Sequence, residues 1–125
     1  MIRVKRTYDP PARGDGRRIL VERLWPRGLR KEELALDAWV KEVAPSTALR
    51  RWFGHRLHRW DEFRRRYREE LIANPGAWER IARAGTRGTV TLLYGAHDTL
   101  HNSALVLRDF LGGRARKRRI SRGKA

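Results

Sequence analysis

The sequence predicts an α/β domain with a small, largely parallel sheet of about three strands covered by about five helices. Three short segments have the β-branched and apolar composition of strands, and a long stretch of helical pattern separates the second from the third. Strands that are separated by helices usually pair in parallel, with the helices packed on the sheet. The 125 residues have room for one such domain with one hydrophobic core.

The three expected strands differ in pattern. Residues 2–6 alternate apolar and polar side chains, as in a strand that is buried on one face. Residues 18–25 are mostly apolar and are closed by Pro26 and Gly28. Residues 89–94 form a short apolar run with β-branched residues at its start. This run is therefore expected to be the central strand.

Helices are expected where apolar side chains recur every three or four residues. Ser46 and Asn74-Pro75 have the residue types that begin helices, and Gly112-Gly113 is expected to end the last helix. The expected helices cover residues 34–43, 47–53, 60–71, 75–85 and 99–111.

The chain is strongly basic, with 30 Lys and Arg residues against 14 Asp and Glu residues and a net charge of +16. Residues 113–125 contain seven of these cations and no acid, which leaves a net charge of +9 for residues 1–112. We expect 1–112 to be the folded domain and 113–125 to be a flexible basic tail. A positive field attracts polyanions without specifying one, and an arginine-rich composition is also typical of GC-rich genomes.

Several classes of protein are disfavoured by composition. The absence of cysteine excludes disulfides, thiolate metal sites and cysteine nucleophiles. No apolar run approaches the roughly 20 residues of a membrane-spanning helix, and the first residues do not resemble a secretory signal. We expect a cytoplasmic protein without a membrane partner, and no motif for a cofactor is visible. The sequence leaves the oligomeric state open.

Polar side chains follow the second and third expected strands, at the point where each strand ends. Arg23 and Arg27 flank Leu24-Trp25-Pro26, whereas Tyr94, Asp98, His101 and Asn102 follow or end the third strand. In an open parallel sheet the carboxyl ends of neighbouring strands form the crevice in which ligands bind. If the two strands are neighbours, the sequence predicts a ligand-binding site formed by Arg23, Arg27, Tyr94 and Asn102.

Each of these groups has a structural alternative. Arginine is the usual bidentate partner of phosphate and carboxylate, but Arg23 could equally pair with a structural carboxylate. His101 with Asp98 is the candidate pair for proton transfer, whereas Asp98 alone would serve as a helix N-cap. Both interpretations remain open at this stage.

A metal site is not expected. His97 and His101 have i,i+4 spacing and His55 and His58 are three residues apart, but neither pair has a matching third ligand. The cationic surroundings also disfavour a divalent ion.

The order and spacing of these motifs resemble the YeaO-like family, domain-of-unknown-function family 488. The motifs are Asp15-Gly16-x-Arg18, Arg23-Leu24-Trp25-Pro26-Arg27-Gly28, Ala44-Pro45-Ser46, Trp52-Phe53-Gly54-His55, Trp60-x-x-Phe63, and Leu92-Leu93-Tyr94 through Asp98-x-x-His101-Asn102. The resemblance covers nearly all of residues 1–112 and implies a compact α/β domain, but it implies no established activity. The chain differs from the family pattern at Glu22, where Asp is expected, at Arg56, where an acid is common, and in its basic tail.

Two classes of function follow from these observations. The first is a protein whose pocket binds a small anionic, phosphate-bearing or nucleotide-like ligand, with hydrolysis or group transfer as the reaction if His101 moves a proton. The second is an accessory protein that binds DNA or RNA through its basic surface, including the arginine-rich helix 59–72. The candidate contacts of the tail are Arg114, Arg116, Lys117, Arg118, Arg119 and Arg122. A tail without any role is the third interpretation.

Deleting residues 113–125 should weaken binding to DNA or RNA while leaving the thermal stability nearly unchanged. The segment has one large apolar residue, Ile120, so its burial cannot offset the entropy of ordering it. Fluorescence anisotropy at low salt and thermal unfolding of both proteins would measure the two effects. An unchanged affinity would show that the tail is not the binding element.

Overall fold

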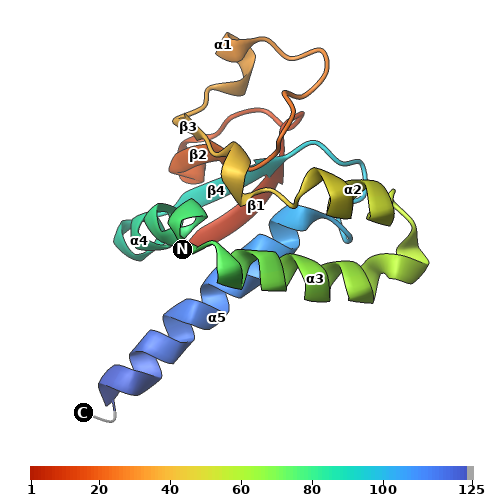
Figure 1. Cartoon of the computed structure of the whole chain (residues 1–125). Coiled ribbons are helices and arrows are strands. Elements are labelled where there is room, and N and C mark those ends of the chain that lie inside the picture. Colours follow the sequence, from red (N-terminus) through yellow and green to blue (C-terminus); the bar gives the residue numbers. More distant parts are fainter. Residues whose placement is uncertain (124–125) are drawn as a thin grey trace.

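The computed structural model describes the backbone of residues 1–123 and the side chains of residues 1–114 (Figure 1). Its sheet has four parallel strands in the order β1-β4-β2-β3. The strands are β1 (Ile2–Arg6), β2 (Arg17–Leu20), β3 (Ala38–Trp39) and β4 (Val90–Tyr94). The predicted α/β class with a parallel sheet is confirmed, as is the central position of the strand at 90–94.

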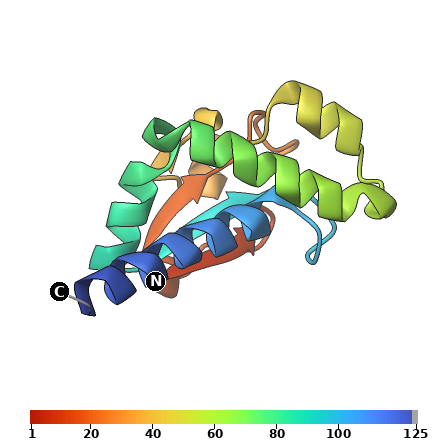
Figure 2. The ribbon, with the colours of Figure 1, turned by 60° about the horizontal axis from the view of Figure 1, so that its bottom comes forward.

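Five α-helices surround the sheet. They are α1 (Lys31–Leu34), α2 (Thr47–Phe53), α3 (Trp60–Ala73), α4 (Glu79–Arg87) and α5 (Ser103–Gly123). In Figures 1 and 2, α3 and α5 lie across the same face of the sheet and α4 lies at one end of it. The segment that contains α1 extends from the opposite side.

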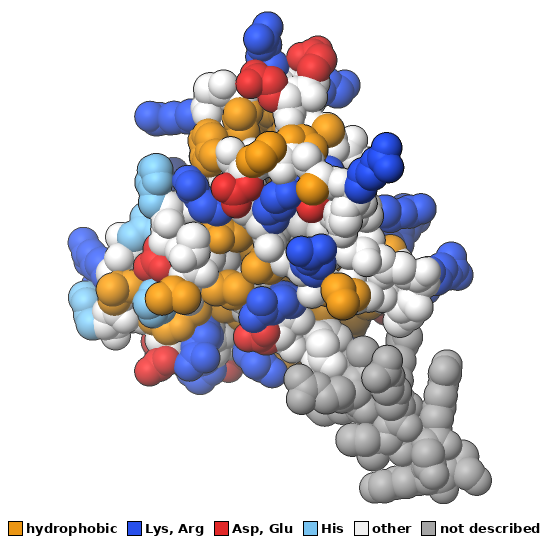
Figure 3. All heavy atoms as spheres, turned by 180° about the vertical axis from the view of Figure 1, so that it is seen from behind, with side chains coloured by type: hydrophobic (Ala, Val, Ile, Leu, Met, Phe, Trp, Pro, Cys, Tyr) orange, Lys and Arg blue, Asp and Glu red, His pale blue; other side chains and the backbone are white. Residues whose placement is uncertain are grey.

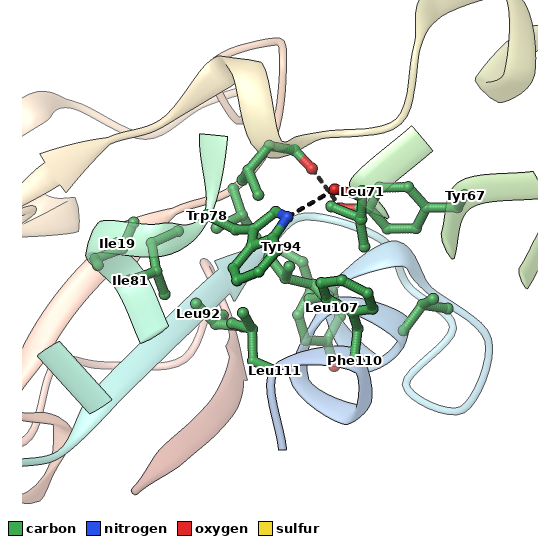
Figure 4. Close-up of a cluster of buried hydrophobic side chains, with 14 of the residues drawn as sticks. Ile19, Tyr67, Leu71, Trp78, Ile81, Leu92, Tyr94, Leu107, Phe110 and Leu111 are labelled. Carbon is green, nitrogen blue, oxygen red and sulfur yellow. Dashed lines mark hydrogen bonds between the residues drawn. The ribbon is translucent and has the colours of Figure 1, made fainter. Parts of the chain in front are cut away.

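The main core lies between the sheet and the helices, because alternate residues of a strand point to opposite faces. Val90, Leu92 and Tyr94 of β4 point into this core. They meet Phe63, Tyr67 and Leu71 of α3 and Ala104, Leu107, Phe110 and Leu111 of α5 (Figure 4). Two buried aromatic residues of this core have hydrogen-bond partners: the Tyr67 hydroxyl donates to Val43 O, and the Trp78 indole Nε1 donates to Leu71 O at 2.7 Å.

The other face of the sheet combines a small apolar cluster with a buried ion pair. Leu20, Leu34 and Leu93 are fully buried there. Next to them the Arg18 Nη1 lies 2.5 Å from Asp15 Oδ2, and both side chains are about 5% exposed. Arg18 Nη2 also donates to Leu34 O at 2.8 Å, so that β2 is joined to the carboxyl end of α1. Arg18 therefore joins β2 both to Asp15, which precedes the strand, and to the carboxyl end of α1.

The turn before β2 requires glycine. Gly16 has a φ of +60°, and a Cβ atom at this position would lie 2.1 Å from Thr89 O. Arg17 N donates to the same carbonyl oxygen at 3.0 Å. The close approach thus aligns the amino ends of β2 and β4, and only a residue without a side chain permits it.

The prediction of a helix over residues 34–43 is wrong. The helix ends after one turn, since Ala35 adopts a left-handed conformation with a φ of 48°. The chain then forms the edge strand β3, in which Ala38 and Trp39 pair with Ile19 and Leu20 of β2. The apolar residues that suggested a helix are instead shared between the two faces of the sheet, a tertiary effect that helical periodicity does not reveal.

The last helix also differs from its expected bounds. It begins at Ser103 rather than near residue 99, and it continues through Gly112-Gly113 to Gly123. Glycine weakens a helix by roughly 1 kcal/mol relative to alanine but does not forbid it. The prediction that Gly112-Gly113 ends the helix is therefore wrong. The side chain of Arg114 lies over the Trp78 and Phe110 rings, 5.6 and 5.1 Å from their centroids. The mobility of residues 113–125 stays a prediction, and the side chains of Arg116, Lys117, Arg118, Arg119 and Arg122 lie outside the described residues.

Asp15→Asn should lower the free energy of unfolding by about 3 kcal/mol at neutral pH, because it leaves the charge of Arg18 buried without its anion. Burial alone would raise the pKa of Asp15, but hydrogen bonds from Ala12, Lys5 and Arg18 outweigh it, and the pKa lies below its ordinary value of 3.8. The carboxylate therefore stabilises the fold fully above that value, and its contribution is lost as the pH falls through the folded-state pKa.

Urea unfolding at pH 7 and below pH 4 would measure this effect. The difference between the parent protein and Asp15→Asn should shrink at the lower pH. Asp61→Asn is the matched control, since Asp61 forms an exposed ion pair with Arg64 at 2.8 Å and such pairs contribute little. Equal effects of the two substitutions would contradict the structural role of the buried pair.

Candidate functional site

The carboxyl ends of β1, β2 and β4 border a cavity of about 740 Å³. Parallel pairing brings together the segments that follow these strands, and the first turn of α5 and parts of α2 and α3 complete the walls. The charged residues and histidines that line it are Glu22, Arg23, Arg27, Arg50, His55, His97, Asp98 and His101. Apolar walls come from Phe53, Phe63, Leu24 and Pro26.

Arg23 is half-buried and anchored by backbone carbonyls. Its Nε donates to Pro45 O at 2.8 Å and its Nη2 lies 3.4 Å from Ala44 O. Among the residues that the structure describes, no carboxylate pairs with it. These contacts orient the guanidinium but do not neutralise its charge.

Arg27 lies at the rim of the same cavity. Its side chain is exposed, and its backbone O accepts a hydrogen bond from the Tyr8 hydroxyl at 3.0 Å. The loop after β1 thereby holds the loop after β2. Within the described part of the chain the Arg27 guanidinium has no hydrogen-bond or ion-pair partner, which leaves its full charge directed to solvent at the cavity mouth.

Asp98 and His101 form a pair in the turn that precedes α5. Asp98 Oδ1 accepts from the N–H groups of Leu100 and His101 at 2.9 and 3.0 Å. The hydrogen bond from Leu100 is the largest cause of the lowered pKa of Asp98, and the His101 ring also contributes. Asp98 therefore remains an anion at neutral pH and cannot supply a proton.

The His101 ring is held from two sides. Its Nδ1 lies 3.0 Å from Asp98 Oδ2, and its ring packs edge-on against Trp60 with centroids 5.3 Å apart. An Nδ1–H that donates to the carboxylate leaves Nε2 as the acceptor of the neutral ring. The pair is thus oriented, and a third of each side chain stays exposed.

Asn102, and not Asp98, caps α5. Its Oδ1 accepts from the Leu105 N–H at 3.0 Å, which is the N-cap arrangement, and its Nδ2 donates to Asp98 O at 3.0 Å. Asp98 instead closes the turn before the helix, so it does not serve as the N-cap that the sequence allowed. Asn102 reaches the cavity wall, but its amide already has partners on both sides.

Tyr94 is placed differently from the other candidate residues. It is 4% exposed, belongs to the main core and does not line the cavity. Burial raises the pKa of its hydroxyl despite the nearby charge of Arg6. The structure therefore brings Arg23, Arg27, Asp98, His101 and Asn102 to one cavity and places Tyr94 beneath it.

Glu22 and Arg50 are cavity residues that the sequence analysis missed. Glu22 Oε1 accepts from the Gly95 N–H at 3.2 Å, a bond between the loops after β2 and β4. Burial raises the pKa of Glu22, while that hydrogen bond and the charges of Arg50 and His55 oppose the rise. An acid directly after the apolar residues 19–21 was the available signal for Glu22. Arg50 offered none, since it is one of many exposed helical arginines.

The cavity is richer in cations than in anions. Three arginines face two carboxylates, and three of the four histidines of the chain add further donors. Figure 3 shows histidine side chains gathered at one edge of the molecule, beside hydrophobic side chains. Within the described residues there is no group of three or more His, Asp or Glu side chains that could hold a metal ion. Nor is any described helix long and apolar enough to cross a membrane.

These features define a small parallel α/β domain with a polar, cation-rich cavity at the carboxyl ends of its strands. A family model described as the inactive DUF488-N3 subclade matches residues 1–124, and the chain belongs to the DUF488 family. The resemblance seen in the sequence motifs is confirmed.

Curated relatives agree with this assignment. The chain is 47% identical over 110 residues to the uncharacterized protein YeaO of Escherichia coli (strain K12), across 88% of this chain and 96% of that protein. It is 39% identical over 113 residues to the uncharacterized protein Rv3073c of Mycobacterium tuberculosis (strain H37Rv), across 90% of this chain and 95% of that protein. The uncharacterized protein Mb3100c of Mycobacterium bovis matches to the same extent. No solved structure gives a significant match.

Glu22→Gln should change how stability depends on pH. Because the folded-state pKa of Glu22 lies above its ordinary value of 4.5, its share of stability is fully present below pH 4.5 and is lost as the pH rises through the folded-state pKa. Glutamine keeps an oxygen acceptor for the Gly95 N–H and removes the buried charge. The variant should therefore gain stability relative to the parent between pH 4 and pH 7.

Urea unfolding at these two pH values would measure the gain. Glu69→Gln serves as a control, since Glu69 is exposed on α3 and is paired with Arg65 at 2.8 Å. A constant difference between parent and Glu22→Gln at both pH values would contradict the raised pKa.

Proposed function

We propose that the cavity binds a small anionic ligand that carries a phosphate or carboxylate group, and that this domain binds the ligand without transforming it. The observation that supports the proposal is the convergence of Arg23, Arg27 and Arg50 on one cavity. None of the three forms an ion pair with a carboxylate of the described residues. An incoming anion would therefore meet guanidinium groups that no direct ion pair with a described residue neutralises.

The geometry suits recognition of an oxyanion. Arginine presents its N–H donors as a planar fork that matches two oxygens of phosphate or carboxylate. Arg23 is already oriented by Pro45 O, so little side-chain entropy remains to be lost when it binds. Ser103 at the amino end of α5 also lines the cavity, where the partial positive charge of the helix adds to the field. The apolar wall of Phe53 and Phe63 favours a ligand with an apolar or aromatic part, such as a nucleotide-like molecule.

Binding is favoured over catalysis for two reasons. The family model that matches the chain is described as an inactive subclade. In addition, Asp98 is engaged by two backbone N–H groups, as expected of a residue that stabilises a turn. In this proposal His101 is a hydrogen-bonding group for the ligand, with Nε2 directed away from Asp98.

The alternative function, binding of nucleic acid, is inferred from the arginine-rich helix 59–72 and the basic segment 113–125. The first of these observations is weakened by ion pairs. In helix 59–72, Arg64, Arg65 and Arg66 form ion pairs with acids of the same helix at 2.6–3.6 Å. Much of this surface is therefore internally neutralised. The role of the basic segment 113–125 stays a prediction.

Arg27→Ala should abolish protection of the protein by small anions against thermal unfolding. A ligand that binds only the folded state raises its stability by mass action, so loss of affinity appears as loss of the thermal shift. The parent and the variant would be heated with a panel of inorganic phosphate, nucleotides and dicarboxylates. Circular dichroism should first show that the variant is folded.

Arg51→Ala is the matched control, because Arg51 lies next to Arg50 on α2 and is exposed but does not line the cavity. It should retain the full shift, and Arg27→Ala should barely alter the salt dependence of DNA binding. Analysis of the incubated ligands by mass spectrometry tests the absence of turnover. If no anion of the panel protects the parent, the proposed cavity function is wrong, and formation of a product would refute its non-catalytic part.

A further inference from the structure

A second depression, of about 360 Å³, lies at the opposite end of the sheet from the cavity. It is located where β2 and β4 begin and where α4 ends. Four arginines line it, namely Arg17, Arg80, Arg83 and Arg87. The remaining lining residues are small or lie in the turn between α4 and β4: Ala84, Gly88 and Thr89.

The secondary structure accounts for this concentration of arginines. Residues 80, 83 and 87 are three and four positions apart in α4 and therefore lie on one face of the helix. Arg17 opens β2, and its backbone N–H donates to Thr89 O at 3.0 Å, which places it across from the end of α4. Ala84 lies on the same helical face as the three arginines, and its short side chain leaves the space that forms the depression.

The charge of this depression is nearly uncompensated. Within the described part of the chain, Arg17, Arg80 and Arg87 have no ion-pair partner, and Arg83 has only a long contact of 3.8 Å with Glu79. In α3, by contrast, three arginines pair with acids of the same helix at 2.6–3.6 Å. All four guanidinium groups are exposed, so water and salt screen their mutual repulsion until an anion replaces the solvent.

We propose that this arginine depression is a second anion site, which binds the phosphate groups of a phosphate-rich ligand. Four guanidinium forks around one hollow can engage several oxygens at once, as adjacent phosphate groups require and a single carboxylate does not. Two sources supply adjacent phosphates: the backbone of a nucleic acid and a small polyphosphate chain. The site shares no residue with the cavity at the carboxyl ends of the strands, so it is independent of the function proposed above.

The backbone of α5 continues past the sheet at the end where the depression lies. In Figures 1 and 2 the carboxyl-terminal half of α5 extends from the same end of the sheet at which α4 lies. This half belongs to the segment 113–125, which contains seven cations and no acid.

The test compares two double variants of the full chain. Arg80→Gln/Arg87→Gln removes two charges from the depression, and glutamine preserves helix propensity. Arg64→Gln/Arg68→Gln removes the same charge from the exposed face of α3 and is the matched control. The probes are tripolyphosphate, followed by thermal shift, and a short labelled DNA duplex, followed by fluorescence anisotropy over a range of salt concentrations.

The Arg80/Arg87 variant should bind the phosphate probe on the order of tenfold more weakly, or worse, than both the parent and the control. With DNA as the ligand, the slope of log K against log salt should become shallower by about 2, close to 0.9 for each phosphate that the variant no longer neutralises. Loss of tripolyphosphate binding alone identifies a small polyphosphate as the source, and loss of DNA binding with the shallower slope identifies a nucleic acid.

Equal losses in the two double variants would show an effect of net charge alone and would overturn the proposal. So would a parent protein that binds neither probe. If Arg80→Gln/Arg87→Gln does not fold by circular dichroism, Arg17→Gln is used instead, since it approaches the same depression from β2. Retention of full affinity by Arg17→Gln would then count against the site.

Discussion

The central strand β4 is the constraint on which the rest of the molecule depends. All five of its residues are buried, and it pairs in parallel with β1 on one side and with β2 on the other. Its side chains pack alternately into two buried clusters. Val90, Leu92 and Tyr94 face the helices, whereas Leu93 packs against Leu20 and Leu34. A strand paired along both edges and covered on both faces cannot shift its register without exposing one of these sets. The positions of its two ends are therefore determined as well.

This arrangement gives the two ends of the sheet different chemistry. At the carboxyl ends of the strands, loops of different origin meet, and Glu22 and Asp98 partly balance the arginines there. At the amino ends, the face of α4 that meets β2 carries arginines, and among the described residues the ion pair formed there is the 3.8 Å contact of Arg83 with Glu79. The two proposed ligands, a small anion and a phosphate-rich molecule, would accordingly bind at opposite ends of the same sheet.

The arginines of this chain have distinct physical roles that its net charge conceals. Arg18 is buried against Asp15 and supports the fold. Arg23 donates to the backbone at Pro45, as Arg59 does to Trp52 O and Arg6 to Ala96 O at 3.0 Å, which holds loops in place. The arginines of α3 pair with neighbouring acids. The arginines that are paired with acids have little charge left for an external anion, so a sum over the sequence overstates the surface that can bind.

Local patterns predicted the parts of the fold that depend on local preferences. The strands at 2–6 and 90–94, the helix capped by Ser46 and the amphipathic helix at 60–73 follow from composition and spacing. The pairing of Ala38 with Ile19 does not follow from composition and spacing, because an edge strand of two residues is stabilised by its neighbour and not by its own propensity. Local patterns also did not predict the bounds of α5. Asn102 caps this helix in place of Asp98 only because of the turn that precedes it.

The same division holds for the candidate site. The sequence by itself determined the α/β class, the family and the presence of polar groups after two strands, because these follow from periodicity and from motifs that are contiguous in the chain. Only the tertiary structure decided that β2 and β4 are neighbours, that Tyr94 is a core residue and that Glu22 and Arg50 belong to the cavity. Among the described residues it also separated the arginines that form ion pairs from those that do not. Pairing and burial depend on which segments meet in space, and a one-dimensional pattern carries no information about the partner that each side chain finds there.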